Sequence, residues 1–187
     1  MTRLALLRHA ETAWSAEGRI QGASDVPILP GQEIRLAEEL KGLHTVTSPL
    51  RRCVETAALL GAGEAAREPR IAEMRWGAWE GRRLEELRAE LGEALRENEA
   101  RGWDFRPQGG ESPREVLARV RPWLAEVAAR GTPTLAVTHR GVIRAVLACA
   151  VGWDLRGKPP ARLDWAAAQL FALAPDGRPT VERLNVR

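Results

Sequence analysis

A short apolar run near the start of the chain, Leu4–Leu7, constrains the fold more than any other segment. Its length and continuous apolar character are typical of a buried strand. Arg8 and His9 follow it directly. Ligands bind beyond the carboxyl ends of the strands in an open α/β sheet, so His9 stands where a reactive side chain would be useful. On its own, a histidine at a strand end is more often a hydrogen-bonded structural residue than a catalytic one.

The same design recurs late in the chain, where the apolar run Thr134–Thr138 ends at His139 and an apolar helix follows over Val142–Val151. Between the two runs, hydrophobic spacing and turn residues predict an alternation of strands and helices. Further strands are expected at residues 43–47, 69–72, 163–173 and 180–186, and further helices at residues 12–16, 32–40, from 48 onward, 82–101 and 112–130.

This order predicts an α/β fold, a three-layer αβα sandwich with a mainly parallel sheet and an antiparallel edge. The chain of 187 residues is long enough for one domain with a substantial core. We therefore expect a single domain over residues 1–187, with a small helical cap at about residues 82–108.

Composition excludes several classes of protein. No apolar run is long enough to span a bilayer, and the four apolar residues after Arg3 are too few for a secretory signal, so a cytoplasmic protein without a membrane partner is expected. Cys53 and Cys149 lie in apolar helical stretches and are expected to be buried thiols. The net charge is +3, but the arginines are dispersed rather than massed, which favours a small anionic substrate over nucleic acid.

Four features converge at strand ends, on one edge of the predicted sheet: Arg8-His9, Arg51, Glu73 and His139. Arg51 is placed by Ser48 and Pro49, which are typical of a helix entry. A cation in the first turn of a helix opposes the helix dipole, so it suggests a bound anion.

Together these side chains suit phosphoryl transfer. A neutral imidazole can attack phosphorus and form a covalent intermediate. Guanidinium groups can hold the equatorial oxygens. A carboxylic acid can protonate the leaving oxygen and then accept a proton from water.

The chain resembles the histidine phosphatase superfamily, which includes cofactor-dependent phosphoglycerate mutases, α-ribazole phosphatases and broad-specificity phosphatases. The resemblance extends from residue 4 to about residue 150. Its motifs are Leu6-Leu7-Arg8-His9-Ala10-Glu11-Thr12, Gly18-Arg19-Ile20-Gln21-Gly22, Ser48-Pro49-Leu50-Arg51, Glu73 through Trp79-Glu80-Gly81, Gly110-Glu111-Ser112 and Val137-Thr138-His139.

The resemblance implies that His9 is the phosphorylated nucleophile and that Glu73 is the proton donor. It implies a phosphate pocket formed by Arg8, Arg51 and His139. It further implies that Gln21 and Gly22 border the phosphate and that Ser15 stands where many members carry Asn. No metal and no other cofactor is implied.

Three residues depart from the family pattern. Ala10 replaces the commoner Gly after the first histidine, and the shorter Ser15 puts one phosphate contact in question. Arg140 follows the second histidine, where Gly is usual. An inward-pointing Arg140 would favour a substrate with a second anionic group, whereas the sequence favours a side chain that points to solvent.

We expect a metal-independent phosphomonoester hydrolase that acts on a small phosphorylated metabolite through a phosphohistidine. The alternative is a cofactor-dependent phosphoglycerate mutase, a phosphotransferase of intramolecular type. The short segment between Gly81 and His139 favours hydrolysis, because the superfamily's classical mutases carry longer segments that close over the substrate. Among the hydrolases, α-ribazole phosphatases and broad-specificity phosphatases are both similar in size, and the sequence does not separate them. The sequence leaves open the substrate and whether the protein is a monomer or a homodimer.

Overall fold

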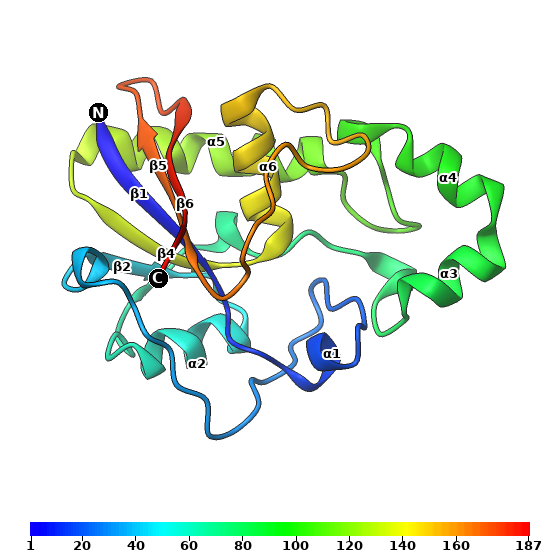
Figure 1. The fold of residues 1–187 in the computed structure, drawn as a ribbon, viewed down its shortest axis with the longest axis horizontal. Coiled ribbons are helices and arrows are strands. Elements are labelled where there is room, and N and C mark those ends of the chain that lie inside the picture. The colour runs from blue at the N-terminus through cyan, green and yellow to red at the C-terminus, as the bar shows by residue number, and fades with distance from the viewer.

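The computed structural model describes residues 1–187 and places strand β1 inside a six-stranded sheet of order β3-β2-β4-β1-β5-β6 (Figure 1). Strands β3, β2, β4 and β1 are parallel, whereas β5 runs antiparallel to β1 and β6 antiparallel to β5. This arrangement confirms the predicted mainly parallel sheet with an antiparallel edge. The strands are β1 Thr2–Arg8, β2 His44–Thr47, β3 Ala66–Arg67, β4 Thr134–Thr138, β5 Ala168–Leu173 and β6 Pro179–Val186.

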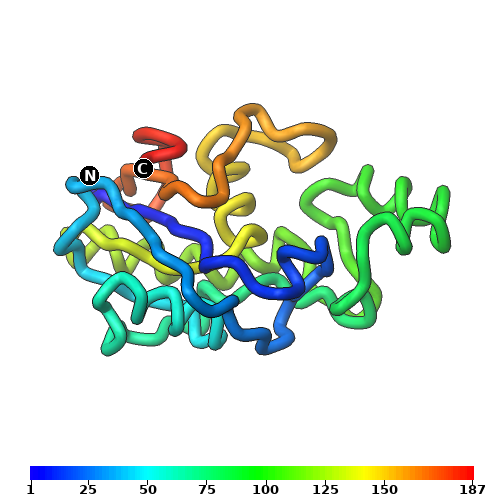
Figure 2. The backbone as a smooth tube through the Cα atoms, turned by 60° about the horizontal axis from the view of Figure 1, so that its bottom comes forward, coloured from blue at the N-terminus to red at the C-terminus, as the bar shows by residue number.

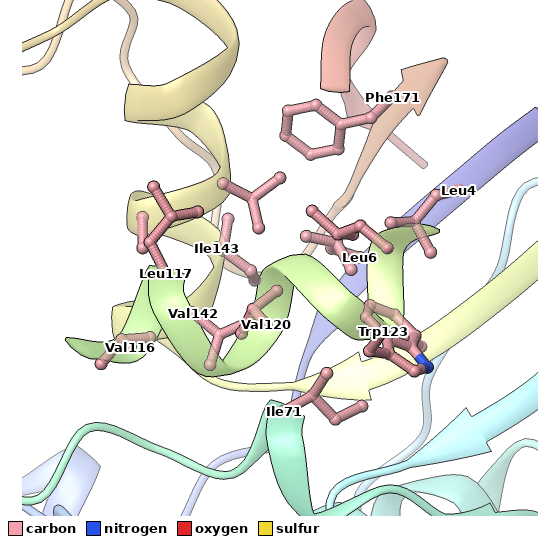
Figure 3. Packing of buried hydrophobic residues seen from close by; sticks show 14 of the residues in the cluster. Leu4, Leu6, Ile71, Val116, Leu117, Val120, Trp123, Val142, Ile143 and Phe171 are labelled. Carbon is pink, nitrogen blue, oxygen red and sulfur yellow. The ribbon is translucent and has the colours of Figure 1, made fainter. Parts of the chain in front are cut away.

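Helices cover both faces of the sheet, which confirms the three layers. Successive side chains of a strand point to opposite faces. In β1, Leu4 and Leu6 accordingly join the larger core cluster, with residues of α5 (Pro113–Arg130) and α6 (Arg140–Val151) (Figure 3). On the other face, Leu7 packs in a second cluster, and Val137 of β4 packs against Cys53 of α2 (Arg51–Leu59). Burial of both faces explains why β1 and β4 are continuous apolar runs.

A short two-helix segment lies to one side of the sheet. It consists of α3 (Leu84–Leu91) and α4 (Glu93–Glu99), and Figure 2 shows it in green, set apart from the strands. The charged run was expected to be one helical stretch. Gly92 interrupts it, at a φ of 51° and a ψ of −117° that a helix does not contain. Its role as a cap remains a prediction. Within residues 1–187 no helix combines the length and the apolar character needed to cross a bilayer.

The predicted helix over Gln32–Leu40 is wrong. Only a 3₁₀ turn forms there, η1 at Glu38–Leu40. The Gln32 side chain donates to the carbonyl oxygens of Glu11 and Leu29, and its own oxygen accepts from the Glu11 amide. These bonds tie the start of the segment to the N-terminal loop. The apolar residues of the segment pack on the second cluster without regular structure.

Two element boundaries also differ from prediction. The third strand is Ala66–Arg67, whereas residues 69–72 contain a 3₁₀ turn, η2 at Pro69–Ile71. Pro69 lacks the N–H that a strand ladder requires. Residues 163–167 precede β5 without joining it. The short helix α1, Ala13–Ala16, lies where a short helix was predicted. The 3₁₀ turns η3, Gly77–Trp79, and η4, Gly102–Asp104, lie in segments expected to be irregular.

Helix α5 begins as predicted, at a capping box. The Ser112 hydroxyl accepts from the Glu115 amide, and the Glu115 carboxylate accepts from the Ser112 amide at 2.9 Å. Ser112→Ala should lower the free energy of unfolding by about 1 kcal/mol, because the Glu115 amide loses the hydroxyl oxygen that accepts its hydrogen bond. Urea denaturation measures the change, with the exposed Thr132→Ala as control. Equal stability of Ser112→Ala and the unmodified protein would contradict this account of the helix start.

Candidate active site

The two predicted histidines meet because β1 and β4 are parallel neighbours. Arg8 pairs in register with Thr138, so the next residue of each strand, His9 and His139, emerges at the same sheet edge. The centroids of their rings lie 5.3 Å apart. Strand β2 ends at the same edge, and Ser48 follows it. The expected convergence of strand ends is therefore present.

The neighbourhood of His9 fixes both its charge and its tautomer. The Nδ1–H donates to the Ala10 carbonyl oxygen at 2.7 Å, because a carbonyl can only accept. The side chain is buried, and burial, followed by the charges of Arg8 and Arg52, lowers the pKa of His9 to about 3. The imidazole is therefore neutral near pH 7 and its Nε2 carries a lone pair. A neutral imidazole with a free nitrogen is a competent nucleophile.

His139 is fully buried beside two small polar side chains. Its Nε2 lies 2.8 Å from the Ser48 hydroxyl oxygen and 3.3 Å from the Cys53 sulfur. Burial, followed by the charge of Arg52, holds the pKa of His139 well below its usual range. The second imidazole is thus also neutral, and its orientation is fixed by β2 and α2.

Two guanidinium groups lie at the site, each with a buried nitrogen that has no hydrogen-bond partner. The Nε atoms of Arg8 and Arg52 are buried and have no hydrogen-bond partner in the chain. Burial is the main cause that lowers the pKa of Arg8 to about 10, and burial also lowers the pKa of Arg52. A buried guanidinium that lacks a carboxylate partner is costly. Two such groups beside neutral imidazoles suit a bound dianion such as phosphate.

The structure does not place Arg51 with the histidines, as its predicted role in a phosphate pocket requires; the next residue, Arg52, lies beside them instead. The Arg51 side chain is 59% exposed and forms an ion pair with Glu55 at 2.6 Å. Arg52 is fully buried, and its charge acts on His9 and His139. Each helix residue turns by about 100°, so adjacent arginines of α2 point in different directions.

One carboxylate oxygen of Glu73 accepts two backbone hydrogen bonds. Its Oε1 accepts from the amides of Met74 at 2.8 Å and Gly141 at 3.0 Å. Burial is the largest influence on the carboxyl group and raises the pKa of Glu73, although these backbone bonds oppose the rise. Gly141 is required there, because a Cβ would lie 2.3 Å from Glu73 Oε1. The arrangement favours a protonated carboxyl near the histidines, as a general acid requires.

Sequence reasoning missed Arg119, which positions the segment that carries Glu73. The Arg119 guanidinium donates to the carbonyl oxygens of Ala72 at 2.8 Å and Glu73 at 3.2 Å, and it pairs with Glu111 at 2.8 Å. One signal in the sequence could have identified Arg119: it lies in line with the apolar face of the helix predicted over residues 112–130.

The predicted substrate-binding residues occupy different surroundings. The Ser15 hydroxyl bonds to the backbone of Thr12 within the cap of α1, and the Gln21 side-chain oxygen accepts from the Thr12 hydroxyl. The Gly22 carbonyl accepts from Arg52 at 2.7 Å, so its loop borders the guanidinium. Arg140 is exposed, and its guanidinium stacks on the Trp165 ring at 4.6 Å. Their contacts with a substrate remain predictions.

Comparison with known proteins decides the family. The sequence model of the histidine phosphatase superfamily, branch 1, matches residues 4–187. The chain belongs to this superfamily. A curated member, phosphoserine phosphatase 1 of Hydrogenobacter thermophilus, is 34% identical over 166 residues, which cover 83% of this chain and 79% of that protein.

Other relatives in the superfamily carry different activities in their names. A probable phosphoglycerate mutase GpmB of Salmonella paratyphi B is 30% identical over 192 residues, covering 92% of this chain and 89% of the relative. A mycobacterial glucosyl-3-phosphoglycerate phosphatase has a similar structure, with a TM-score of 0.76, 25% identity and full coverage of both chains. These likenesses also agree with the α/β fold described above.

The two adjacent arginines of α2 provide a matched test of this histidine phosphatase site. Arg52→Gln should weaken binding of inorganic phosphate by about 10- to 100-fold, because a charged donor to the anion is lost. Arg51→Gln should change binding by less than about threefold, since an exposed pair with Glu55 contributes little. Isothermal titration calorimetry measures both affinities, and thermal unfolding shows that each variant is folded. A larger loss in Arg51→Gln would restore the original assignment.

Proposed function

We propose that this protein is a metal-independent phosphomonoester hydrolase that acts through a phosphohistidine on His9. The proposal rests on the imidazole of His9, which is neutral and makes one hydrogen bond, through Nδ1. It lies beside two guanidinium groups whose Nε atoms have no hydrogen-bond partner. No group of three or more His, Cys, Asp or Glu side chains within residues 1–187 could hold a metal ion, and the proposed steps use only side chains of the chain.

In the first step, His9 Nε2 attacks phosphorus and the bond from phosphorus to the ester oxygen breaks. The electron pair of that bond goes to the leaving oxygen, which takes the proton of Glu73. Arg8, Arg52 and His139 hold the three remaining phosphoryl oxygens. These groups are already fixed by the fold, so they stabilise the transferred group without reorganisation.

In the second step, water attacks the phosphohistidine. The Glu73 carboxylate accepts a proton from the water as its oxygen bonds to phosphorus. The nitrogen–phosphorus bond breaks and its electron pair returns to Nε2, so phosphate leaves and the enzyme is regenerated. The raised pKa of Glu73 suits both roles, because a carboxyl of intermediate acidity can give a proton and take it back.

Hydrolysis and mutase activity differ only in the acceptor of the phosphoryl group. The named relatives include both kinds of enzyme. The full mutual coverage with a mycobacterial phosphatase supports hydrolysis, because a chain of this length carries that activity in the relative. A phosphoglycerate mutase remains the alternative, in which the segment of α3 and α4 would have to shield the phosphohistidine from water.

The decisive experiment is phosphate release from a panel of monoesters in the presence of EDTA. The panel contains phosphoserine, 3-phosphoglycerate, α-ribazole phosphate and p-nitrophenyl phosphate, and a parallel assay measures mutase turnover with 3-phosphoglycerate and 2,3-bisphosphoglycerate. We expect release that survives EDTA, exceeds mutase turnover and falls to background in His9→Ala. Loss of release with EDTA would contradict the metal-independent mechanism, and mutase turnover above hydrolysis would favour the alternative.

Glu73→Gln should slow turnover according to the leaving group. An alkyl alcohol leaves poorly without a proton, whereas nitrophenolate leaves readily. We therefore expect a loss of about 100-fold or more for 3-phosphoglycerate and a much smaller loss for p-nitrophenyl phosphate. Steady-state kinetics with both substrates measures the two losses. Equal losses would show that Glu73 does not protonate the leaving oxygen.

A further inference from the structure

Arg140 lies at the site but has no role in the chemistry proposed above. It is the first residue of α6, between His139 and Gly141, whose amide binds the Glu73 carboxylate. No carboxylate lies within ion-pair distance of its guanidinium, although 17 ion pairs link other charged side chains of the protein. The charge of Arg140 is therefore uncommitted within the chain.

The side chain of Arg140 is held by an aromatic platform. Its guanidinium lies 4.6 Å from the centroid of the Trp165 ring, and Trp165 is half-buried against the larger core cluster. Stacking fixes the plane of a guanidinium and leaves its N–H edge free. Such an edge matches the two oxygens of a carboxylate.

The backbone places Arg140 beside the groups proposed to act on the phosphate, because it follows His139 directly and precedes Gly141, whose amide donates to Glu73. After burial, Arg140 is the next influence that lowers the pKa of Arg8, and the charge of Glu73 in turn acts on Arg140. A phosphate dianion would balance the charges of Arg8 and Arg52. With Glu73 protonated, the positive charge of Arg140 would remain for a second anionic group on the same substrate.

From this arrangement we infer that Arg140, stacked on Trp165, binds a carboxylate of the substrate and selects phosphomonoesters that carry one near the phosphate. This specificity role rests on the proposed hydrolase function. Phosphoserine and 3-phosphoglycerate, the chemical groups in the names of two relatives, both have this structure.

The test compares substrates that differ only in the carboxylate. The two pairs are 3-phosphoglycerate with glycerol 3-phosphate, and phosphoserine with phosphoethanolamine. For each pair, the ratio of kcat/KM values removes effects on the shared phosphate chemistry. Arg140→Gln should lower this ratio about tenfold or more, mainly through KM of the carboxylated substrate, because a charged pair with its anion is lost. Arg140→Lys keeps the charge without the planar fork and should cause a smaller loss.

Arg144→Gln is the matched control. Arg144 lies one turn further along α6 and stacks on Trp153 at 5.2 Å, so it repeats the same interaction at greater distance along the helix. The charge of Glu73 also acts on Arg144, but the Arg144 guanidinium lies over Trp153 rather than Trp165, so the ratio should stay within about twofold of the unmodified protein. Equal losses in Arg140→Gln and Arg144→Gln would overturn the inference, because they would indicate a general field rather than a specific pair.

Two results separate this inference from the proposed function. If p-nitrophenyl phosphate is hydrolysed and Arg140→Gln leaves both ratios unchanged, the inference fails and the hydrolase stands. If no ester is hydrolysed, the hydrolase fails, and titration calorimetry with 3-phosphoglycerate and glycerol 3-phosphate tests Arg140 by affinity alone. A selective loss of 3-phosphoglycerate binding in Arg140→Gln then supports the inference, and an equal loss for both ligands overturns it.

Discussion

Parallel pairing of β1 with β4, and of β4 with β2, is the constraint on which the rest of the site depends. It brings His9, His139 and Ser48 to one edge with no contribution from a long loop. A slip of one residue would turn every side chain of β1 to the other face. Leu6 and Leu7 pack in different clusters, so the core resists that slip on both sides of the sheet. The same packing that stabilises the sheet therefore holds the two imidazoles together.

Burial of the positive charges of Arg8 and Arg52 keeps the two histidines neutral, and it also opposes folding. Arg8 and Arg52 disfavour protonation of the histidines, which keeps the His9 lone pair available. The arginines themselves lose hydration without gaining a carboxylate, which opposes folding. The hydrophobic clusters on both faces of the sheet must offset this cost. An anion that binds only the folded chain would reduce it and so stabilise the protein.

The sequence predicted those parts of the fold that local pattern determines. Continuous apolar runs identified β1 and β4, and the capping box at Ser112 identified the start of α5. The segment from Gln32 was mispredicted because its apolar spacing suits a helix, while side-chain bonds to a distant loop decide its path. Those bonds join residues that no local pattern connects.

The sequence predicted the site residues that directly follow strands. It missed the arginine whose direction depends on how helix α2 is rotated about its axis. His9 and His139 follow from the order of the elements, whereas Glu73 follows a 3₁₀ turn where a strand was predicted. The choice between Arg51 and Arg52 depends on which side of α2 faces inward. Cys53, Thr56 and Ala57 mark the buried side of that helix, and Arg52 lies one turn before Thr56. The buried face of the helix therefore identifies Arg52 as the inward arginine, once the helix is taken to begin after Pro49.

Arg52 also links the proposed phosphate site to the loop beside it. Its two terminal nitrogens donate to the carbonyl oxygens of Gly22 and Ser24, and Glu80 accepts from the amides of Ser24 and Trp76. Gly22, at a φ of +54°, leaves room that a Cβ would take from Glu80. Because the terminal nitrogens of Arg52 are already committed, its free Nε can bind an anion without breaking these bonds. The loop and the guanidinium are thus fixed before a substrate arrives, which is the condition under which fixed charges stabilise a transferred phosphoryl group most effectively.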